Sequence, residues 1–188
     1  RNWQAGEEAQ KMEAELCKYL GIRYAVLTSS GSCAGLLALT ALELPRNSEV
    51  IISAVTFPTI FNIILQCGLK PVVVDTDVGT YNFNLEKVEK AITKNTKAII
   101  AIHALGNPVK LIKLQKICHD KKIKLILDNC DGLGTILFGQ KVETYADVSF
   151  TSFHAAHIVS MGVGGGIFTN DEKLAQRIRM YRDWGRQA

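Results

Sequence analysis

The chain has 188 residues, of which 47% are hydrophobic, and its formal net charge is +4 at pH 7. This size and composition predict a chain that folds around one sizeable α/β core. The basic residues are scattered and form no stripe with interleaved aromatic residues, so we expect no nucleic-acid partner. No apolar run reaches about 18 residues, so we expect no membrane span.

The cysteines and the first residues bear on the compartment and on the completeness of the chain. The five cysteines are an odd number and form no Cys-x-x-Cys pair, which argues against a disulfide framework and favours a cytoplasmic protein. The opening residues Arg1–Gln4 are neither a signal peptide nor a methionine start, so we expect a fragment of a longer chain.

Short apolar, β-rich runs alternate with helical patterns along the chain. Several runs, for example Ala98–Ile102, are continuously apolar, which is typical of strands buried on both faces of a mostly parallel sheet. We therefore predict one α/β domain with a mostly parallel, seven-stranded sheet and helices on both faces. In chain order, the expected elements are a helix over about 6–20, a strand over 25–28, a helix over 33–43, a strand over 50–53, a helix over 58–67, a strand over 72–75, a helix over 84–93, a strand over 98–103, a helix over 109–121, strands over 125–128, 148–152 and 166–169, and a helix over 171–183.

Two helix starts carry residues suited to capping. Asn84 is expected to cap the helix that begins near Leu85. Asn170 is expected to cap the last helix, with Asp171 and Glu172 in its first turn, where acidic side chains are favoured by the helix dipole.

A turn of small residues, Thr28–Ala34, joins an expected strand to an expected helix. Its exposed backbone N–H groups, the helix dipole and the hydroxyls of Ser30 and Ser32 suit an anion, and Gly31 permits close approach. An ordinary strand–helix turn with a serine cap explains the same residues equally well.

Two further candidates follow expected strands. Asp128 ends a strongly apolar strand, and ligands gather at the carboxyl ends of strands in open α/β sheets. Its carboxylate could pair with a protonated ring nitrogen, although a helix cap or a turn residue is the alternative. Phe57 follows another strand and could stack on a planar ligand, although an aromatic residue there is more often part of the core.

The histidines are candidates for proton transfer. His157 follows an expected strand and precedes the glycine-rich turn Gly162–Gly166. A histidine in a loop is usually structural or solvated, and His103, His119 and His154 are equally available by residue type. The residue types alone leave this choice open.

The order and spacing of these candidates resemble the DegT/DnrJ/StrS-type sugar aminotransferases over essentially the whole chain. Members of that family hold pyridoxal phosphate as a Schiff base on a lysine five residues after a serine. Here Ser152 is that serine and His157 stands in the lysine position. An imidazole lacks the primary amine that the link needs, but it still transfers protons near neutral pH. Relatives with the same replacement are nucleotide-sugar 3-dehydrases, typified by CDP-4-keto-6-deoxyglucose 3-dehydrase. The segments most similar to them are Asp128–Asp131, Ala156–His157, Met161–Gly162 and Arg182–Arg186.

The resemblance implies pyridoxamine 5′-phosphate, or its aldehyde form pyridoxal 5′-phosphate, as a cofactor held without a covalent bond. It implies two catalytic residues, His157 as the base and Asp128 as the partner of the ring N1–H. Phe57 is expected to stack on the pyridine ring, and Asp131 to lie beside the ring's hydroxyl edge. The residues expected near the cofactor phosphate are Ser30, Gly31, Ser32 and Ser152.

Three departures from the family pattern limit what the resemblance implies. Val163 replaces the glutamate that is usual in the Gly-Glu-Gly-Gly turn. Iron–sulfur members take a cluster ligand from the Cys130 position and the others from a cysteine group that would begin after Arg186, where only Gln187 and Ala188 follow. A [2Fe-2S] cluster is therefore unsupported, and we expect no metal unless such a group exists. Family members are also longer, so residues 1–188 are expected to be a large cofactor-binding domain of aspartate-aminotransferase type, without a leading segment or the small C-terminal domain.

The reaction implied by the resemblance is removal of the C3 hydroxyl from a nucleotide-linked 4-keto-6-deoxyhexose. This lyase reaction belongs to deoxysugar biosynthesis, for a lipopolysaccharide or a natural product. The resemblance also implies a homodimer and a reductase partner. Two alternatives stay open: a sugar aminotransferase whose lysine has been replaced, and a non-catalytic fragment that serves as a binding or dimerisation module.

Overall fold

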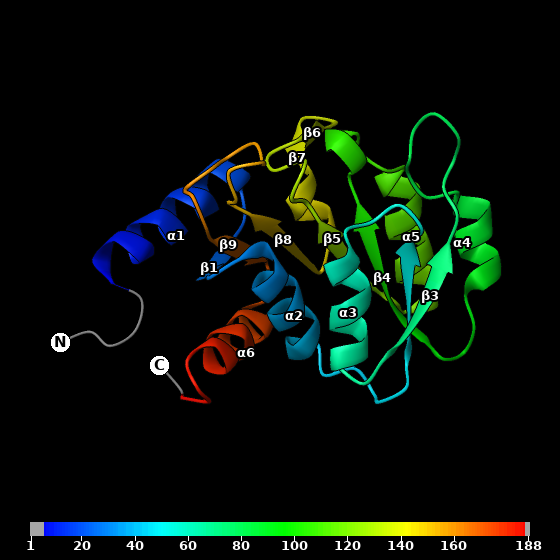
Figure 1. Ribbon diagram of the computed structural model, residues 1–188, viewed down its shortest axis with the longest axis horizontal. Coiled ribbons are helices and arrows are strands. Elements are labelled where there is room, and N and C mark those ends of the chain that lie inside the picture. Colours follow the sequence, from blue (N-terminus) through cyan, green and yellow to red (C-terminus); the bar gives the residue numbers. More distant parts are fainter. Residues whose placement is uncertain (1–5, 187–188) are drawn as a thin grey trace.

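The computed structural model describes residues 6–186 and shows one seven-stranded sheet between helices (Figure 1). The strands lie in the order β1-β9-β8-β5-β4-β2-β3. These strands are β1 (Tyr24–Thr28), β2 (Glu49–Ser53), β3 (Lys70–Val74), β4 (Thr96–Ile102), β5 (Lys124–Asp128), β8 (Val148–Ser152) and β9 (Gly165–Thr169). The helices are α1 (Glu7–Leu20), α2 (Gly31–Ala41), α3 (Pro58–Gln66), α4 (Leu85–Ala91), α5 (Leu111–Lys121) and α6 (Glu172–Arg182).

The direction of the strands places most of their carboxyl ends at one edge of the sheet. β9 pairs antiparallel with β1 and β8, whereas the pairings β8–β5, β5–β4, β4–β2 and β2–β3 are parallel. β1, β2, β4, β5 and β8 therefore all end at the edge from which the loops to the following elements start. The predicted sheet and its two layers of helices are confirmed, and each predicted element is present with bounds within a few residues.

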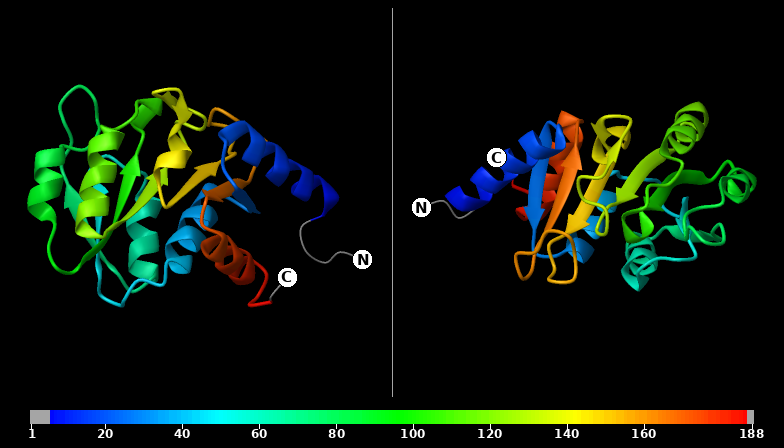
Figure 2. Two further views of the ribbon diagram at one scale, coloured as in Figure 1. Left: turned by 180° about the vertical axis from the view of Figure 1, so that it is seen from behind. Right: turned by 90° about the horizontal axis from the view of Figure 1, so that it is seen from above.

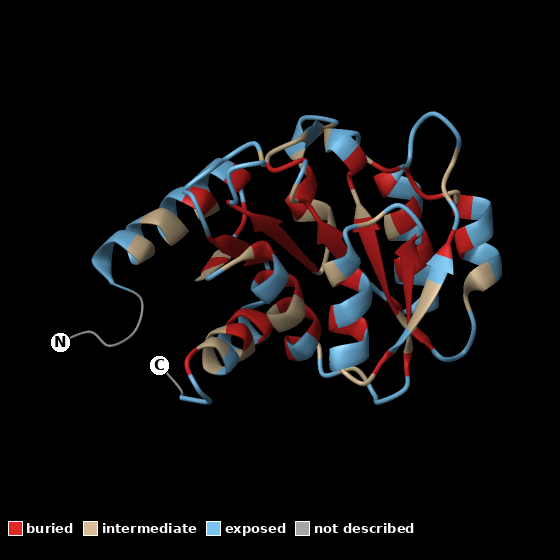
Figure 3. Ribbon diagram, in the orientation of Figure 1, coloured by how far each residue is buried: buried red, intermediate tan, exposed pale blue. Residues whose placement is uncertain are grey.

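The core lies on both faces of the sheet, which explains why the strands are continuously apolar. Ile100 of β4 faces the buried cluster under α2, α3 and α6, whereas the adjacent Ile99 and Ala101 face the cluster under α4 and α5. A smaller cluster lies under α1. Figures 2 and 3 show the two helical layers and the buried strands between them. Within residues 6–186, no helix is both long and apolar enough to cross a bilayer.

One of the two predicted caps is correct. The Asn84 side chain accepts a hydrogen bond from the backbone N–H of Lys87 at the start of α4. The prediction for Asn170 is wrong, because Asp171 is the residue immediately before α6 and its carboxylate accepts from the N–H of Leu174. The Asn170 side chain instead accepts from the N–H of Arg23 and joins the end of β9 to the start of β1.

A short hairpin and a 3₁₀ turn between β5 and β8 were not expected from the sequence. They are β6 (Ile136–Leu137), β7 (Gln140–Lys141) and η2 (Val142–Tyr145). The hairpin turns through Phe138 and Gly139, both with positive φ angles. Strands this short carry too few residues for an apolar alternation to be recognised. This segment contacts the residues that follow β5, because Asn129 and Gly134 donate hydrogen bonds to Glu143 of η2.

Candidate functional site

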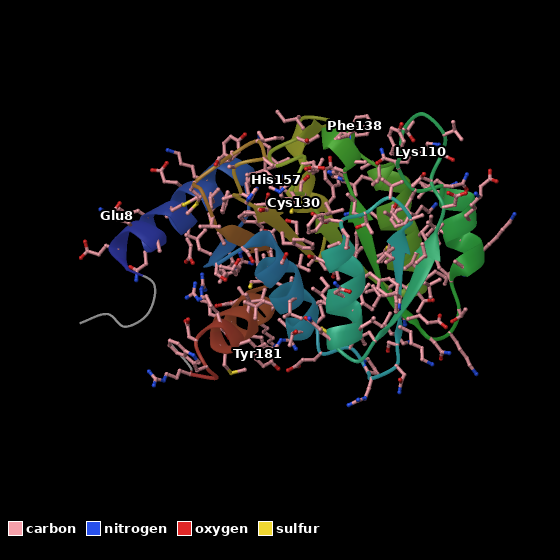
Figure 4. All side chains as sticks on the ribbon, in the orientation of Figure 1. Glu8, Lys110, Cys130, Phe138, His157 and Tyr181 are labelled. Atoms are coloured by element: carbon pink, nitrogen blue, oxygen red, sulfur yellow. The ribbon has the colours of Figure 1, made fainter. Side chains whose placement is uncertain are left out.

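The predicted site residues lie at the edge where the parallel strands end. They belong to four segments, which follow β1, β2, β5 and β8. Direct contacts join these segments in pairs, so residues far apart in the sequence form one continuous surface. Figure 4 shows two of its members, Cys130 and His157, close together at this edge.

The turn after β1 forms the start of helix α2. Ser30 is its cap, and the Ser30 hydroxyl oxygen accepts a hydrogen bond from the N–H of Cys33 at 3.1 Å. The capping role is therefore present. The N–H groups of Gly31 and Ser32 have no acceptor within the helix because they belong to its first turn, and the helix dipole favours an anion beside them. Capping and anion binding are compatible in this geometry.

Gly31 is required by the close approach of β8. A Cβ atom at this position would lie 2.5 Å from the Cβ of Ser152, the last residue of β8. On the next strand, a Cβ at Gly165 would collide with the backbone oxygen of Ser30. The turn therefore fits against β8 and β9 only with glycines, and Ser152 lies beside the first turn of α2. The Ser152 hydroxyl also accepts from the N–H of His154 at 3.2 Å.

The segment after β2 adds an exposed aromatic ring. Phe57 is the residue before α3, and it is 70% exposed although it is large and apolar. The Thr59 hydroxyl lies 3.2 Å from the Ser32 hydroxyl, which places this segment next to the start of α2. The hydroxyl oxygen of Thr56 is buried without a hydrogen-bond partner among the described residues. An exposed ring beside hydroxyls and free N–H groups suits a planar ligand that carries an anionic group.

Asp128 is the last residue of β5 and is buried. Burial raises the pKa of its carboxyl group, and the negative charge of Asp131 acts in the same direction. Hydrogen bonds from Cys130 and the nearby His157 oppose the increase, and the N–H of Cys130 donates to Asp128 at 3.2 Å. A buried carboxylate of this kind would be stabilised by a cationic N–H group placed against it.

His157 is connected to the same pair of acids. Its Nδ1 atom lies 3.1 Å from a carboxylate oxygen of Asp131. A carboxylate accepts hydrogen bonds, so this contact favours the tautomer with the proton on Nδ1 and a lone pair on Nε2. The loop that carries His157 is closed at its base, where the N–H groups of Phe153 and Met161 donate to the carbonyls of Gly164 and Phe153.

The other three histidines have different surroundings. His103 is buried, and His119 lies at the end of α5, where its nearest acidic partner is the exposed Asp120. His154 is exposed, and its Nδ1 atom accepts from the N–H of Ala156. The rings of His154 and His157 meet edge-on, with centroids 6.3 Å apart. His157 is therefore the histidine that contacts the Asp128–Asp131 pair.

Cys130 lies between these acids in the sequence. It is half-buried, and burial together with the charges of Asp128 and Asp131 raises the pKa of its thiol. Across residues 6–186, no group of three or more His, Cys, Asp or Glu side chains is arranged to hold a metal ion.

Three buried polar residues behind the site were not identified from the sequence. Asn129 immediately follows Asp128, its side-chain oxygen lies 3.1 Å from Nδ1 of His103, and its amide nitrogen donates to Glu143. His103 was considered only as an alternative histidine for proton transfer, and Asn129 belonged to a segment similar to the family without a role of its own. Glu143 lies in the unexpected η2 turn, so no sequence signal connected it with the site.

Comparison with known proteins identifies the family. The model of the DegT/DnrJ/EryC1/StrS aminotransferase family matches residues 1–188. The chain belongs to this family. The fold is that of the large domain of fold-type I aminotransferases: the chain superposes on the aminotransferase from Psychrobacter cryohalolentis with a TM-score of 0.95 and 28% identity, covering 99% of this chain and 47% of that one.

Among relatives in this family are nucleotide-sugar 3-dehydratases. The chain is 40% identical over 190 residues to dTDP-4-dehydro-2,6-dideoxy-D-glucose 3-dehydratase of Saccharopolyspora spinosa, covering 97% of this chain and 41% of the relative. It is 42% identical over 182 residues to the lipopolysaccharide biosynthesis protein RfbH of Salmonella typhimurium, covering 93% of this chain and 42% of that protein. It also superposes on an E. coli GDP-4-keto-6-deoxy-D-mannose-3-dehydratase with bound hydrated PLP, with a TM-score of 0.88 and 33% identity over 92% of this chain and 46% of that one. The chain thus spans less than half the length of these proteins.

Proposed function

We propose that the protein containing this chain is a pyridoxamine-phosphate-dependent dehydrase that removes the C3 hydroxyl of a nucleotide-linked 4-keto-6-deoxyhexose. The observation that carries the proposal is His157, which occupies the family's lysine position and is hydrogen-bonded to Asp131 beside Asp128. A base without a primary amine fits elimination better than transamination. Two relatives named as 3-dehydratases, at 40% and 39% identity where they match, support the assignment.

The residues present fit such a cofactor. The first turn of α2, with Gly31 against Ser152, offers N–H and hydroxyl donors to a phosphate, and Ser30 and Ser32 add to them. The exposed Phe57 ring is available for stacking. When bound, the cofactor supplies an amine that reacts with a sugar ketone and a ring that accepts electrons.

Three acidic and basic side chains then divide the proton chemistry. Asp128 holds the proton on the ring nitrogen, because a buried carboxylate gains most from a cationic partner. Asp131 fixes the ring of His157 through Nδ1, which leaves the Nε2 lone pair to remove a proton at the reacting carbon. In this proposal Asp131 would also lie beside the hydroxyl edge of the bound cofactor.

The proposal extends to partners and compartment. The chain is the large cofactor-binding domain of a cytoplasmic homodimer, and a reductase completes the deoxygenation. A nucleotide-sugar substrate is supported by the structure of a related GDP-4-keto-6-deoxymannose-3-dehydratase with bound GDP-perosamine. The five cysteines are free thiols, in keeping with a reducing compartment.

Reduction of the loaded full-length protein tests the non-covalent cofactor. After borohydride treatment, intact-mass and peptide spectrometry should find no cofactor attached to the chain, because His157 has no primary amine. A reduced adduct on a lysine near the site would overturn this part of the proposal and would favour the aminotransferase alternative.

Substitution of His157 tests the reaction. His157→Asn should abolish C3 deoxygenation while cofactor binding is largely retained, since the amide cannot act as a base at neutral pH. His157→Lys should introduce a covalent link to pyridoxal phosphate, visible as a new absorption band, with loss of dehydrase activity. Full activity in His157→Asn would place the base elsewhere, with His154 as the next candidate.

A further inference from the structure

The turn that carries Asp131 is held from behind by a segment outside the site. This turn covers residues 129–134, between β5 and β6. The segment, here called the β7–η2 arm, comprises residues 140–145. Its contacts to the turn come from Glu143 and Lys141, and neither residue belongs to the proposed cofactor or proton-transfer machinery.

Glu143 binds both ends of the turn with one carboxylate oxygen. Oε1 accepts from the side-chain amide of Asn129 at the first residue and from the backbone N–H of Gly134 at the last, the latter at 2.9 Å. Lys141 adds a third bond, since its Nζ donates to the carbonyl of Gly134 at 2.8 Å. Asp131 lies between these two fixed ends.

The opposite side of the turn is fixed by the loop after β4. Asn129 donates its amide N–H to Glu143, so its carbonyl oxygen is free to accept from Nδ1 of His103. A Cβ at Gly132 would lie 2.6 Å from this Asn129 oxygen, which shows how closely the turn is folded over the side chain. The hydrogen bonds therefore run from His103 through Asn129 to Glu143.

We propose that Glu143 is a positioning residue for His157, acting through the 129–134 turn and Asp131. The proposal rests on the proposed function only in the role given to His157. Glu143 is buried and therefore holds the turn without exchanging with solvent. Without it, Asn129 and Gly134 lose their shared acceptor, and Asp131 is no longer fixed at 3.1 Å from Nδ1. The groups that face His157 are Asp131, Asp128 and His154, so loss of the Asp131 contact leaves no fixed acceptor on Nδ1 among them.

The test compares Glu143→Ala with Glu143→Gln in the full-length protein. Glutamine keeps an oxygen that accepts both hydrogen bonds, and burial already raises the pKa of Glu143 towards the neutral form. Glu143→Ala should lower kcat roughly 10- to 100-fold with little change in KM, because misplacement of a reacting group affects the transition state. Glu143→Gln should restore most of kcat.

A spectroscopic readout separates positioning from folding and from the reaction itself. Long-range ¹H–¹⁵N correlation of the His157 ring in the resting protein should show the Nδ1–H tautomer in wild type and Glu143→Gln, and a mixture of tautomers in Glu143→Ala. The control is Thr169→Val, which removes another buried hydrogen bond, to the carbonyl of Asp147, at the opposite edge of the sheet. It should lower the melting temperature and leave the His157 signal unchanged.

The outcomes test the positioning role of Glu143 and the proposed dehydrase reaction independently. A folded Glu143→Ala protein with an unchanged His157 tautomer would overturn the positioning role, whatever its activity. A changed tautomer in Glu143→Ala, together with a wild-type protein that has no dehydrase activity, would support positioning and refute the proposed reaction. Should Glu143→Ala not fold, Lys141→Met removes the weaker contact of the same arm and should change the His157 signal in the same direction by less. An unchanged signal in that variant would then overturn the proposal.

Discussion

The two edges of the sheet use polar residues in opposite ways. At the edge where the parallel strands begin, Asp147 accepts from Nζ of Lys124 at 2.7 Å and from the N–H of Leu125 at 2.9 Å. Glu49, at the start of β2, similarly accepts from the hydroxyls of Thr93 and Thr96. Both of these carboxylates are satisfied by other groups of the same chain.

At the carboxyl edge, several groups are arranged toward solvent or are incompletely paired. Phe57 is largely exposed, the buried Thr56 hydroxyl has no partner among the described residues, and burial raises the pKa of Asp128. The difference teaches that the carboxylates of one edge complete the fold, whereas the groups of the other edge remain available for the ligand that we propose. Substitution of a residue proposed to face the ligand should therefore affect activity, whereas substitution at the first edge, or of the buried and tightly packed groups behind the site, should affect stability.

The largest expected effect is that of Asp128→Asn at the carboxyl edge. The protein should fold, because the amide is similar in size and avoids burial of a charge. Turnover should fall by about 100-fold or more, equivalent to about 3 kcal/mol, because a neutral amide cannot hold the proposed ring proton. Steady-state kinetics of the full-length protein, with circular dichroism as a check of folding, measures both. Near-normal turnover would remove Asp128 from the proposed mechanism.

A pH-dependent effect of similar size is expected at His103. Burial lowers the pKa of His103 from 6.5 to about 4. The unfolded chain therefore binds a proton before the folded protein does as the pH falls. The contribution of His103 to the free energy of unfolding should therefore decrease as the pH drops from 6.5 towards 4, and about 3 kcal/mol should be lost by about pH 4.

Replacement by glutamine isolates this contribution. The buried acids Asp128 and Glu143, whose pKa values are raised, have the opposite dependence, so the difference between wild type and His103→Gln is the quantity to measure. Urea unfolding between pH 4 and pH 7 should show that difference shrinking as the pH falls. The same substitution at the exposed His119 should leave the pH dependence of wild type intact. A constant difference across this pH range would show that His103 is not the group responsible.

The sequence predicted the fold, and it predicted that the candidate residues Asp128 and Phe57 lie at or after the ends of strands of the sheet. Runs such as Ile99–Ala101 are recognisable because burial on both faces requires continuous apolar residues. The proposal that His157 stands in the family's lysine position likewise came from the sequence, because it depends on spacing alone. Both features are encoded locally in the sequence.

Features that depend on tertiary contact were not predictable. The cap of α6 was placed one residue too early, because Asn170 and Asp171 are both good caps and only the helix position distinguishes them. The bond between Glu143 and Asn129 joins residues 14 positions apart through a hairpin that has no clear sequence pattern. The hydrogen bonds that join His103, Asn129 and Glu143 behind Asp131 could therefore not be predicted from the sequence.

A smaller, steric effect is expected from Gly31→Ala. The added Cβ would lie 2.5 Å from the Cβ of Ser152, so α2 and β8 must separate. We expect a loss of stability of about 1–3 kcal/mol, as for other overpacked positions. Denaturant titration should show partial recovery in the double variant Gly31→Ala/Ser152→Gly, where the opposing Cβ is absent. Gly6→Ala, which meets no atom within 4 Å, is the control for the steric clash, and its effect should be limited to the weaker N-cap of α1 and be the same with or without Ser152→Gly.

The smallest expected effect is that of Lys124→Met at the amino edge. This change removes the ion pair with Asp147, whose two side chains are 49% and 34% exposed. Solvent screening limits such pairs to about 0–1 kcal/mol, and Asp147 keeps its hydrogen bond from the N–H of Leu125. The melting temperature should fall slightly, by an amount that decreases with added salt, and the kinetic constants should stay at wild-type values. A kinetic defect in Lys124→Met as large as that of Asp128→Asn would break the distinction between the two edges, because it would require a residue at the start of β5 to act on chemistry at its other end.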